Sequence, residues 1–320
     1  MLSRTADYLF WMARYMERAE NTARMLGVSY EMSLLPQSQD AAEQGWRGLL
    51  SISELTSSFA QRYAAVSARN VMDFMIRDES NPSSILSCVR AARENARAVR
   101  GALTTEVWET QNQTWLEFNK LLRAESTLRD PGPVLERVKT RSHLSRGVTV
   151  GTMLHDEALH FLRIGTFLER ADNTARLLDV KFQALGGGDF FGGQAKEGQE
   201  VDFYHWSAIL RSVSGFEIYR KVYRNVIVPE KVAELLILRP DMPRSLAACM
   251  NDVVANLSLV ANEQSAETLR RAGRLRSDLQ YARIDEILAT GLHAYLTQFL
   301  DRVGDLGVGI SRDFLVPMAA

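Results

Sequence analysis

The stretch ERAENTARML at residues 17–26 returns as ERADNTARLL at residues 169–178, with eight of ten positions identical. At 100° per residue, Glu17, Asn21 and Arg24 fall along one line of a helix. The apolar residues of the same helix fall along the opposite line; they are Met12, Met16, Ala19, Ala23 and Leu26. This spacing predicts an amphipathic helix with an ordered polar face, present twice in the chain.

Other residues also repeat, at a spacing of 160 or 161 positions. They are Trp46 and Trp206, Tyr63 and Tyr223, Cys88 and Cys249, Asn95 and Asn256, and the start signals Pro82-Ser83-Ser84 and Pro243-Arg244-Ser245. Because the ER stretches are only 152 apart, the additional residues fit best in the Gly-rich segment 186–199. We interpret residues 1–317 as one helical domain with pseudo-repeats 1–147 and 148–317, packed face to face in one bundle. Independent folding of each half is the alternative.

Apolar residues recur throughout at i, i+3, i+4 and i+7, and alternating strand-like segments are nearly missing from the sequence. The sequence therefore predicts an all-α protein, a bundle of long helices. The expected helices are 3–35, 46–62, 67–77, 81–124, 133–145, 154–184, 202–225, 229–238, 243–281 and 284–303, with Ser3 and Asn81 as N-caps and a polar loop over 36–45.

Composition excludes several classes of protein. A net charge of −1 argues against general binding to nucleic acid or to an anionic membrane, which both need clustered positive charge. Two cysteines are too few for a disulfide framework or a four-ligand zinc site. The N-terminal sequence is unlike a signal peptide, and no run approaches the roughly 20 apolar residues of a membrane span. We expect a cytoplasmic protein that is not integral to a membrane.

The two ER stretches have diverged less than the surrounding sequence. Only 7 of 29 positions agree between residues 71–99 and 232–260. An apolar core alone would retain the alanines, but it would not retain Glu17/Glu169, Asn21/Asn173 and Arg24/Arg176. Three hypotheses account for this polar face.

The first hypothesis is that the polar residues form exposed i, i+4 ion pairs on the helix surface, such as Glu20 with Arg24 and Asp172 with Arg176. Such pairs contribute only about 0.2–0.5 kcal/mol each, which is too little to keep these residues identical in the two stretches.

The second hypothesis is a buried network in which Glu17, Arg24, Glu169 and Arg176 interlock where the two helices meet. Removing one member of such a network costs about 3–5 kcal/mol, because a buried charge is left unpaired. The third hypothesis is a polar cleft for a ligand or a partner's peptide, in which arginines bind a carboxylate or phosphate and a glutamate binds an amine or acts as a base.

A stripe of four arginines, Arg90, Arg93, Arg97 and Arg100, is specific to the first half of the chain. Aligned cations repel one another, and Glu94 lies off to one side, so the compensating charges must come from elsewhere. The stripe is either a solvated, salt-bridged face or a site for an anion or an acidic partner.

Glu157 and His160 have the Glu-x-x-His spacing of di-iron bundles, but no second such pair occurs, so we expect no metal site. The sequence also lacks a P-loop, a Rossmann glycine pattern and a Gly-x-Ser-x-Gly nucleophile motif, so we expect no cofactor. Cys88 and Cys249 lie on apolar faces, which is typical of small core residues.

Three stretches resemble the bacterial alpha-E family, an all-helical family named for its Glu-Arg motif. They are residues 1–26, NPSSILSCVRAARENARAVR at 81–100 and FLRIGTFLERADNTARLLD at 161–179, and the resemblance covers nearly the whole chain. The family's ER positions correspond to Glu17-Arg18 and Glu169-Arg170, and its Ala-Arg-Glu-Asn-Ala-Arg element corresponds to residues 92–97. Thr166 stands where the first half has Arg14, so the two polar faces differ.

The resemblance implies certain partners: circularly permuted ATP-grasp proteins, transglutaminase-like peptidases and sometimes a proteasome-like hydrolase. It suggests a role in ATP-dependent formation or processing of peptide amide bonds. The leading hypothesis is a helical partner of an ATP-grasp amide ligase that does not itself bind nucleotide, and that binds the ligase or its peptide substrate. One alternative is an enzyme of peptide or amide chemistry with Glu17 or Glu169 as acid or base. Another is a structural scaffold with a buried ionic network. The candidate binding residues are Arg14, Glu17, Arg18, Asn21, Arg24, Arg93, Arg97, Glu169, Arg170, Asn173 and Arg176.

Overall fold

The computed structural model describes residues 1–184 and 199–315, and within these ranges the chain forms α-helices and one short 3-10 helix but no strand. The all-α prediction is confirmed. In the first part of the chain the helices are α1 (Ser3–Ser33), α2 (Gln39–Ile52), α3 (Thr56–Ala60), α4 (Ala68–Ile76), α5 (Ile85–Ala98), α6 (Thr105–Leu121), α7 (Glu125–Arg129) and α8 (Gly132–Thr152).

In the second part the helices are α9 (Glu157–Ala184), α10 (Gln199–Ser212), α11 (Phe216–Tyr223), α12 (Pro229–Ile237), α13 (Leu246–Leu259), α14 (Ala266–Tyr281), α15 (Ile284–Thr290) and α16 (Leu292–Phe314). The expected Gly-rich loop spans residues 186–199; residues 185–198 lie outside the described residues, and Gln199 already belongs to α10. The division into pseudo-repeats stays a prediction.

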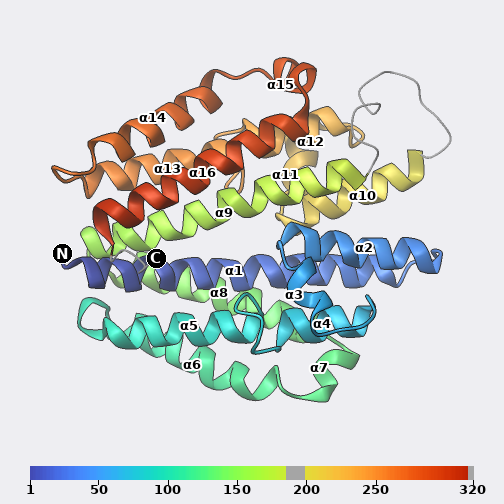
Figure 1. The fold of residues 1–320 in the computed structure, drawn as a ribbon, viewed down its shortest axis with the longest axis horizontal. Coiled ribbons are helices and arrows are strands. Elements are labelled where there is room, and N and C mark those ends of the chain that lie inside the picture. Colours follow the sequence, from blue (N-terminus) through green and yellow to red (C-terminus); the bar gives the residue numbers. More distant parts are fainter. Residues whose placement is uncertain (185–198, 316–320) are drawn as a thin grey trace.

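The two helices that carry the ER stretches, α1 and α9, run side by side through the middle of the molecule (Figure 1). Helices α5 and α8 pack against α1 on one side, and α13 and α16 pack against α9 on the other. The two central helices approach closely at Gly165, where an added Cβ would lie 2.3 Å from the carbonyl oxygen of Phe10. A glycine is therefore required at this crossing.

Serine and threonine caps explain where several helices begin. Ser84 accepts a hydrogen bond from the Ser87 backbone N–H (3.2 Å), and Ser245 accepts one from Ala248 N–H (3.0 Å). The expected N-cap at Asn81 is therefore wrong by three residues, because Asn81 instead turns back and donates to the Phe74 carbonyl (3.1 Å). The cap expected at Ser3 is also wrong, since Leu2 holds that position without a side-chain bond.

Several expected helices are shorter than predicted, because turn signals inside them were overlooked. Residues 81–124 divide at a 3-10 turn (Arg100–Ala102), after which Thr104 caps α6. Residues 46–62 divide at Glu54 and 202–225 at Ser214, both with positive φ, and 284–303 divides at Gly291, with φ 103°. Residues 243–281 divide between Leu259 and Ala266. Conversely, α2 begins inside the expected loop because Ser38 caps it, and α8 continues past residue 145 to Thr152.

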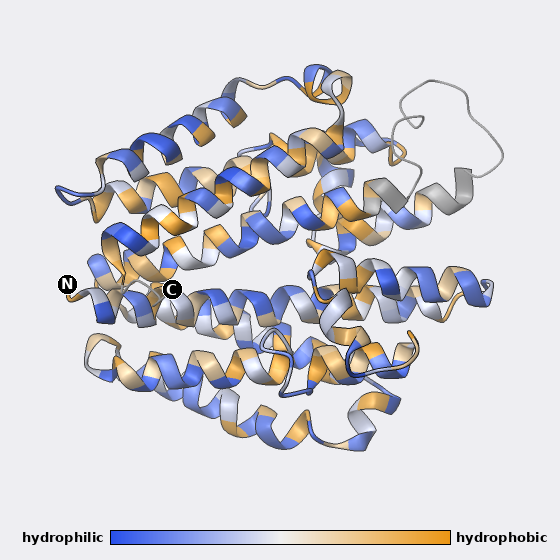
Figure 2. Cartoon of the chain, viewed as in Figure 1, coloured by the Kyte–Doolittle hydropathy of each residue, from blue (hydrophilic) through white to orange (hydrophobic). Residues whose placement is uncertain are grey.

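The central part of α1 is buried on both its apolar and its polar side. Ala19, Ala23 and Leu26 have no exposed surface, and Glu17 and Glu20 are equally inaccessible at 1% and 0%. Figure 2 shows the resulting hydrophilic segments of α1 and α9 in the middle of the molecule. No helix in the described ranges is both long and apolar enough to cross a bilayer.

Candidate functional site

The two ER dipeptides exchange partners across the contact between α1 and α9. Arg170 of the second dipeptide donates to both carboxylate oxygens of Glu17, through Nε and Nη2, each at 2.9 Å. Arg18 of the first dipeptide donates to both oxygens of Glu169, from Nε at 2.6 Å and from Nη2 at 3.1 Å. Each glutamate therefore neutralises the arginine that belongs to the other stretch.

Two further arginines complete the cluster around Glu17. Arg244, which directly precedes the N-cap of α13, donates from Nη1 to Glu17 Oε1 at 2.9 Å. Arg146 of α8 donates from Nη1 to Glu17 Oε2 at 3.0 Å. We call the group of Glu17, Glu20, Asn21, Arg24, Arg146, Arg170 and Arg244 the Glu17 cluster.

The remaining acceptors of the Glu17 cluster are Glu20 and Asn21, one turn further along α1. Glu20 accepts hydrogen bonds from Arg24 (2.7 Å), from the Ser142 hydroxyl (2.7 Å), and from Arg146 and Arg244. Asn21 Oδ1 accepts from Arg244 Nη1 at 2.8 Å. Every carboxylate in the cluster is saturated with donors from the chain itself. The Glu17 cluster is therefore a closed structural ion-pair network.

The surroundings of Glu169 are more open. Besides Arg18, its carboxylate accepts from Arg14 Nε at 2.7 Å, and Arg18 Nη1 lies 3.4 Å from the hydroxyl of Ser83. One turn along α9, Asp172 pairs with Arg176 (2.8 Å), and Arg176 also reaches Glu54 at 2.5 Å. We call Arg14, Arg18, Ser83, Glu169, Asp172, Asn173, Arg176 and Glu54 the Glu169 cluster.

The predicted network is therefore partly right and partly wrong in its pairing. Glu17 and Glu169 are buried and lie where the two helices meet, as expected for a network. Their arginine partners are Arg170 and Arg18, whereas Arg24 pairs with Glu20 and Arg176 with Asp172 at i, i+4. Arg24 lies seven positions, or about two helical turns, after Glu17, and Arg176 lies equally far after Glu169. At that separation neither arginine reaches the glutamate, and each pairs with the acidic residue one turn away.

The buried carboxylates of Glu17, Glu20 and Glu169 have pKa values below the ordinary value, which favours their ionised form. Burial acts to raise the pKa of Glu169, but the charges and hydrogen bonds of Arg14 and Arg18 outweigh it and lower that pKa to about 2. Burial is likewise opposed at Glu17 by Arg170 and Arg244, and its pKa falls below the ordinary value. A carboxylate so stabilised is a weak base, so this arrangement favours fixed charge recognition over proton transfer.

A polar pocket of about 250 Å³ opens beside Glu169. Its charged lining comes from the Glu169 cluster, Thr22 and Ser53 add two hydroxyl groups, and its apolar lining includes Met25, Ile52 and Met75. A second pocket, of about 170 Å³, lies beside Glu17 between α1, α8 and α9, with mostly apolar walls that include Met12, Met16 and Phe167. The described part of the chain thus offers a charged pocket at one ER glutamate and an apolar one at the other.

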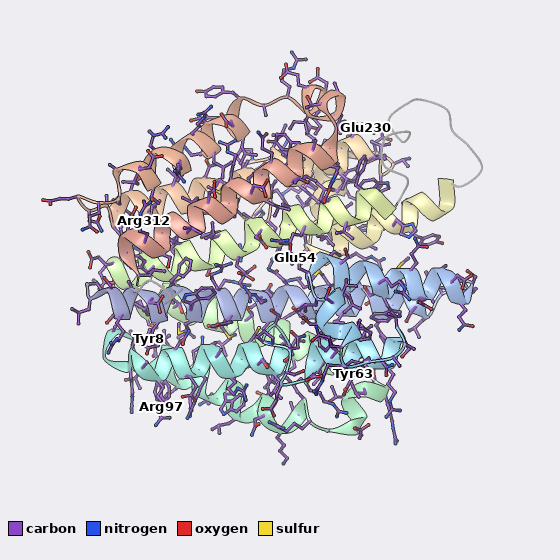
Figure 3. All side chains as sticks on the ribbon, viewed as in Figure 1. Tyr8, Glu54, Tyr63, Arg97, Glu230 and Arg312 are labelled. Atoms are coloured by element: carbon purple, nitrogen blue, oxygen red, sulfur yellow. The ribbon has the colours of Figure 1, made fainter. Side chains whose placement is uncertain are left out.

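The arginine stripe is a salt-bridged face apart from both clusters. Arg93 and Arg97 both pair with Glu94, so the expectation that their partners come from elsewhere is wrong for these two residues. Glu94 and Arg97 are neighbours on the helix surface because they are three positions apart, whereas Arg93 is adjacent to Glu94 in the chain and reaches it through its long side chain. Arg90 pairs with Glu79, and Arg100 stacks on Trp108 at 5.5 Å. Figure 3 shows Arg97 at the outer edge of the view and Glu54 near the centre of the view, where the Glu54 side chain is exposed.

The Glu-x-x-His pair of α9 makes other contacts. Glu157 accepts a hydrogen bond from the N-terminal amine of Met1, and His160 Nδ1 lies 2.9 Å from Asn256 Oδ1. Among the described residues, no group of three or more His, Cys, Asp or Glu side chains is arranged to hold a metal ion. Cys88 and Cys249 are fully buried, and burial raises the pKa of each thiol to about 12.

Sequence reasoning missed four residues that shape the clusters: Arg146, Arg244, Ser83 and Glu54. Ser83 and Arg244 could have been found, since they are the middle residues of the start signals Pro82-Ser83-Ser84 and Pro243-Arg244-Ser245. Arg146 and Glu54 carry no sequence signal, because their approach to the ER helices depends on how α8 and the end of α2 are packed.

An all-helical fold built around two reciprocally paired Glu-Arg dipeptides defines the class of this protein. Residues 1–315 match Alpha-E, described as a predicted alpha-helical domain with a conserved ER motif, and the chain belongs to that family. A protein of Mycobacterium bovis described as uncharacterized is 26% identical over 93% of this chain, and two of Mycobacterium tuberculosis are 26% and 25% identical over the same share. The chain spans only 35% of the length of these relatives. No solved structure matches the chain.

Proposed function

We propose that this protein is a helical partner of an ATP-grasp amide or peptide ligase, located in the cytoplasm, and that it binds the ligase's peptide substrate at the Glu169 cluster. The observation that carries the proposal is the charged pocket beside Glu169. The resemblance to alpha-E proteins, which implies ATP-grasp and transglutaminase-like companions, supplies the reaction system. The protein itself contributes binding and takes no part in nucleotide chemistry.

The pocket has the properties that a peptide site needs. It presents carboxylates and guanidinium groups whose positions are fixed by partly buried ion pairs, so these side chains lose little conformational entropy on binding. Charged groups of both signs discriminate peptide side chains by charge, because a mismatched charge is left without a partner. The apolar residues beside them provide contact surface for the uncharged part of a ligand.

Acid/base catalysis by Glu17 or Glu169 has less support. Each carboxylate accepts hydrogen bonds from at least two arginines, and both have pKa values below the ordinary range. A general base works best with a pKa near the working pH. The geometry therefore favours ligand binding as the role of Glu169 and a structural role for Glu17.

Co-purification tests the partnership. We expect the affinity-tagged protein to retain the ATP-grasp ligase from cells that encode both, in buffer containing ATP and peptide. If the tagged protein does not retain the ligase even with ATP and peptide present, the proposal is contradicted.

The arginine stripe is tested in the same assay as a docking surface for the ligase. Arg97→Gln should weaken retention, while Arg283→Gln should not, because both arginines are similarly exposed, at 66% and 69%, but only Arg97 belongs to the stripe. If the two variants retain the ligase equally, Arg97 of the arginine stripe is not part of the interface with the ligase.

A further inference from the structure

Ser83 and Arg244 occupy corresponding places in the fold. Each directly precedes the N-cap serine of a 14-residue helix, α5 or α13, and each of these helices packs against one of the ER helices. Arg18 Nη1 lies 3.4 Å from the Ser83 hydroxyl, and Arg170 Nη1 lies 3.3 Å from the Pro243 carbonyl beside Arg244. The place before α13 therefore holds a long cationic side chain, Arg244, and the corresponding place before α5 holds a short neutral one, Ser83.

The guanidinium of Arg244 satisfies three acceptors of the Glu17 cluster. It donates to Glu17 Oε1 and Asn21 Oδ1 from Nη1, at 2.9 and 2.8 Å, and to Glu20 from Nη2. The same positions on α9 are Glu169, Asp172 and Asn173. All three line the pocket beside Ser83.

The two glutamates match bond for bond except at this place. Glu17 receives a two-point bond from Arg170, a bond to Oε2 from Arg146 and a bond to Oε1 from Arg244. Glu169 receives a two-point bond from Arg18 and a bond to Oε2 from Arg14. Within the described chain, Glu169 Oε1 has a single donor, so it retains acceptor capacity, and Glu169 lines the pocket.

The neighbouring acceptors are also incompletely used. Glu20 takes donors from three arginines and Ser142, whereas Asp172 takes them from Arg176 alone among the described residues. Asn21 Oδ1 is bonded to Arg244; for Asn173 the described contact is a 3.9 Å approach of its amide nitrogen to the Met25 sulfur.

Charge balance permits one more cation in the pocket. In the Glu17 cluster two carboxylates, Glu17 and Glu20, face four guanidinium groups, those of Arg24, Arg146, Arg170 and Arg244. In the Glu169 cluster three carboxylates, Glu169, Asp172 and Glu54, face three guanidinium groups, those of Arg14, Arg18 and Arg176. A guanidinium bound in the pocket would still leave the net charge of the Glu169 cluster less positive than that of the Glu17 cluster.

We propose that the pocket beside Ser83 binds the guanidinium group of an arginine side chain from a peptide, in the place that Arg244 fills in the Glu17 cluster. The guanidinium bonds to Glu169 Oε1, Asp172 and Asn173 Oδ1, and its aliphatic stem lies against Met25, Ile52 and Met75. The inference rests on the proposed function for the source of this arginine, and deepens it by naming the side chain that is recognised.

Isothermal titration calorimetry with the purified chain tests the ligand chemistry. The probe is acetyl-Gly-Arg-Gly-amide, which has no charged terminus, and the matched control replaces its arginine by citrulline, which has the same shape without the charge. We expect the arginine peptide to bind at least tenfold more tightly than the citrulline peptide. Free arginine is a second arm that separates a peptide site from an amino-acid site. Equal affinity for arginine and citrulline, or preference for a glutamate peptide, would overturn the inference.

Filling the pocket from within tests its location. In Ser83→Arg the new side chain should take the guanidinium site and abolish peptide binding. Ser58→Arg adds the same charge at an exposed position of α3 outside the pocket, and it should bind the peptide like the original protein. Asp172→Asn removes one acceptor and should weaken binding at least tenfold, so it serves as the second test if Ser83→Arg does not fold. Unchanged binding in folded Ser83→Arg or in Asp172→Asn would refute the assignment.

Failure of this inference is distinguishable from failure of the proposed function. Retention of the ligase without arginine-peptide binding would leave the partnership standing and remove the guanidinium site. Arginine-peptide binding without ligase retention would establish the site and remove the partnership.

Discussion

The carboxylate of Glu17 on α1 accepts two hydrogen bonds, both 2.9 Å, from the guanidinium of Arg170 on α9. The same two helices repeat the exchange in the opposite direction between Glu169 and Arg18. A slide of one turn, about 5.4 Å, would break both pairs and leave buried charges unpaired. The reciprocal pairs therefore fix the register of the two central helices.

Glu17→Gln should lower the free energy of unfolding by roughly 3–5 kcal/mol, because Arg170 and Arg244 would remain buried without their counter-charge. Urea unfolding followed by circular dichroism measures the loss. Glu31→Gln is the matched control on the same helix, since Glu31 is exposed and should change stability by less than about 0.5 kcal/mol. Similar losses for the two variants would show that the Glu17 cluster does not stabilise the fold.

Glu169→Gln should cost less, roughly 1–3 kcal/mol. The side chains of Arg14 and Arg18 are 19% and 27% exposed, against 9% and 8% for Arg170 and Arg244, so water can solvate them when the charge of Glu169 is lost. The same urea experiment compares the two variants. A loss at Glu169 as large as that at Glu17 would mean that the pocket is less accessible to water than its geometry indicates.

Stability should fall as the pH is lowered from about 5 towards 2. The folded-state pKa of Glu169 is about 2, below the ordinary value of 4.5, because Arg14 and Arg18 outweigh the effect of burial. Above pH 5 both folded and unfolded states are ionised and the stabilisation is complete; below it the unfolded state binds a proton first. Urea unfolding at several pH values should show a smaller dependence for Glu169→Gln. Parallel pH curves for the two proteins would contradict this assignment.

Gly165→Ala should destabilise the contact between α1 and α9, because its Cβ would lie 2.3 Å from the Phe10 carbonyl oxygen. Overpacking of this kind costs roughly 1–3 kcal/mol. Gly147→Ala is the control, since nothing lies within 4 Å of its Cβ, and it should gain about 0.5–1 kcal/mol from helix propensity. Thermal melts measure both. If the melting temperature of Gly165→Ala equals or exceeds that of the unsubstituted protein, α1 and α9 are not in close contact at Gly165.

Much of the fold could be predicted from periodicity, because apolar spacing and caps are local properties. The position of α1 was predictable within two residues, and the burial of Glu17 and Glu169 was one of three open hypotheses. The breaks at residues 100–102 and at Ser214 were not predicted although Gly101 and Gly215 mark them, and the break at Glu54 has no glycine or proline beside it. At Glu54 the packing of neighbouring helices, and not local preference, decides where the chain turns.

By itself the sequence determined that the chain is helical, that ERAENTARML and ERADNTARLL form matching helices, and that their polar faces are constrained beyond what a core requires. Only the tertiary structure decided that Glu17 pairs with Arg170 and Glu169 with Arg18, that Arg244 closes one cluster, and that Ser83 leaves the other open. The physical reason is that helical spacing fixes which residues share a face, whereas ion pairing depends on distances between residues more than 150 positions apart.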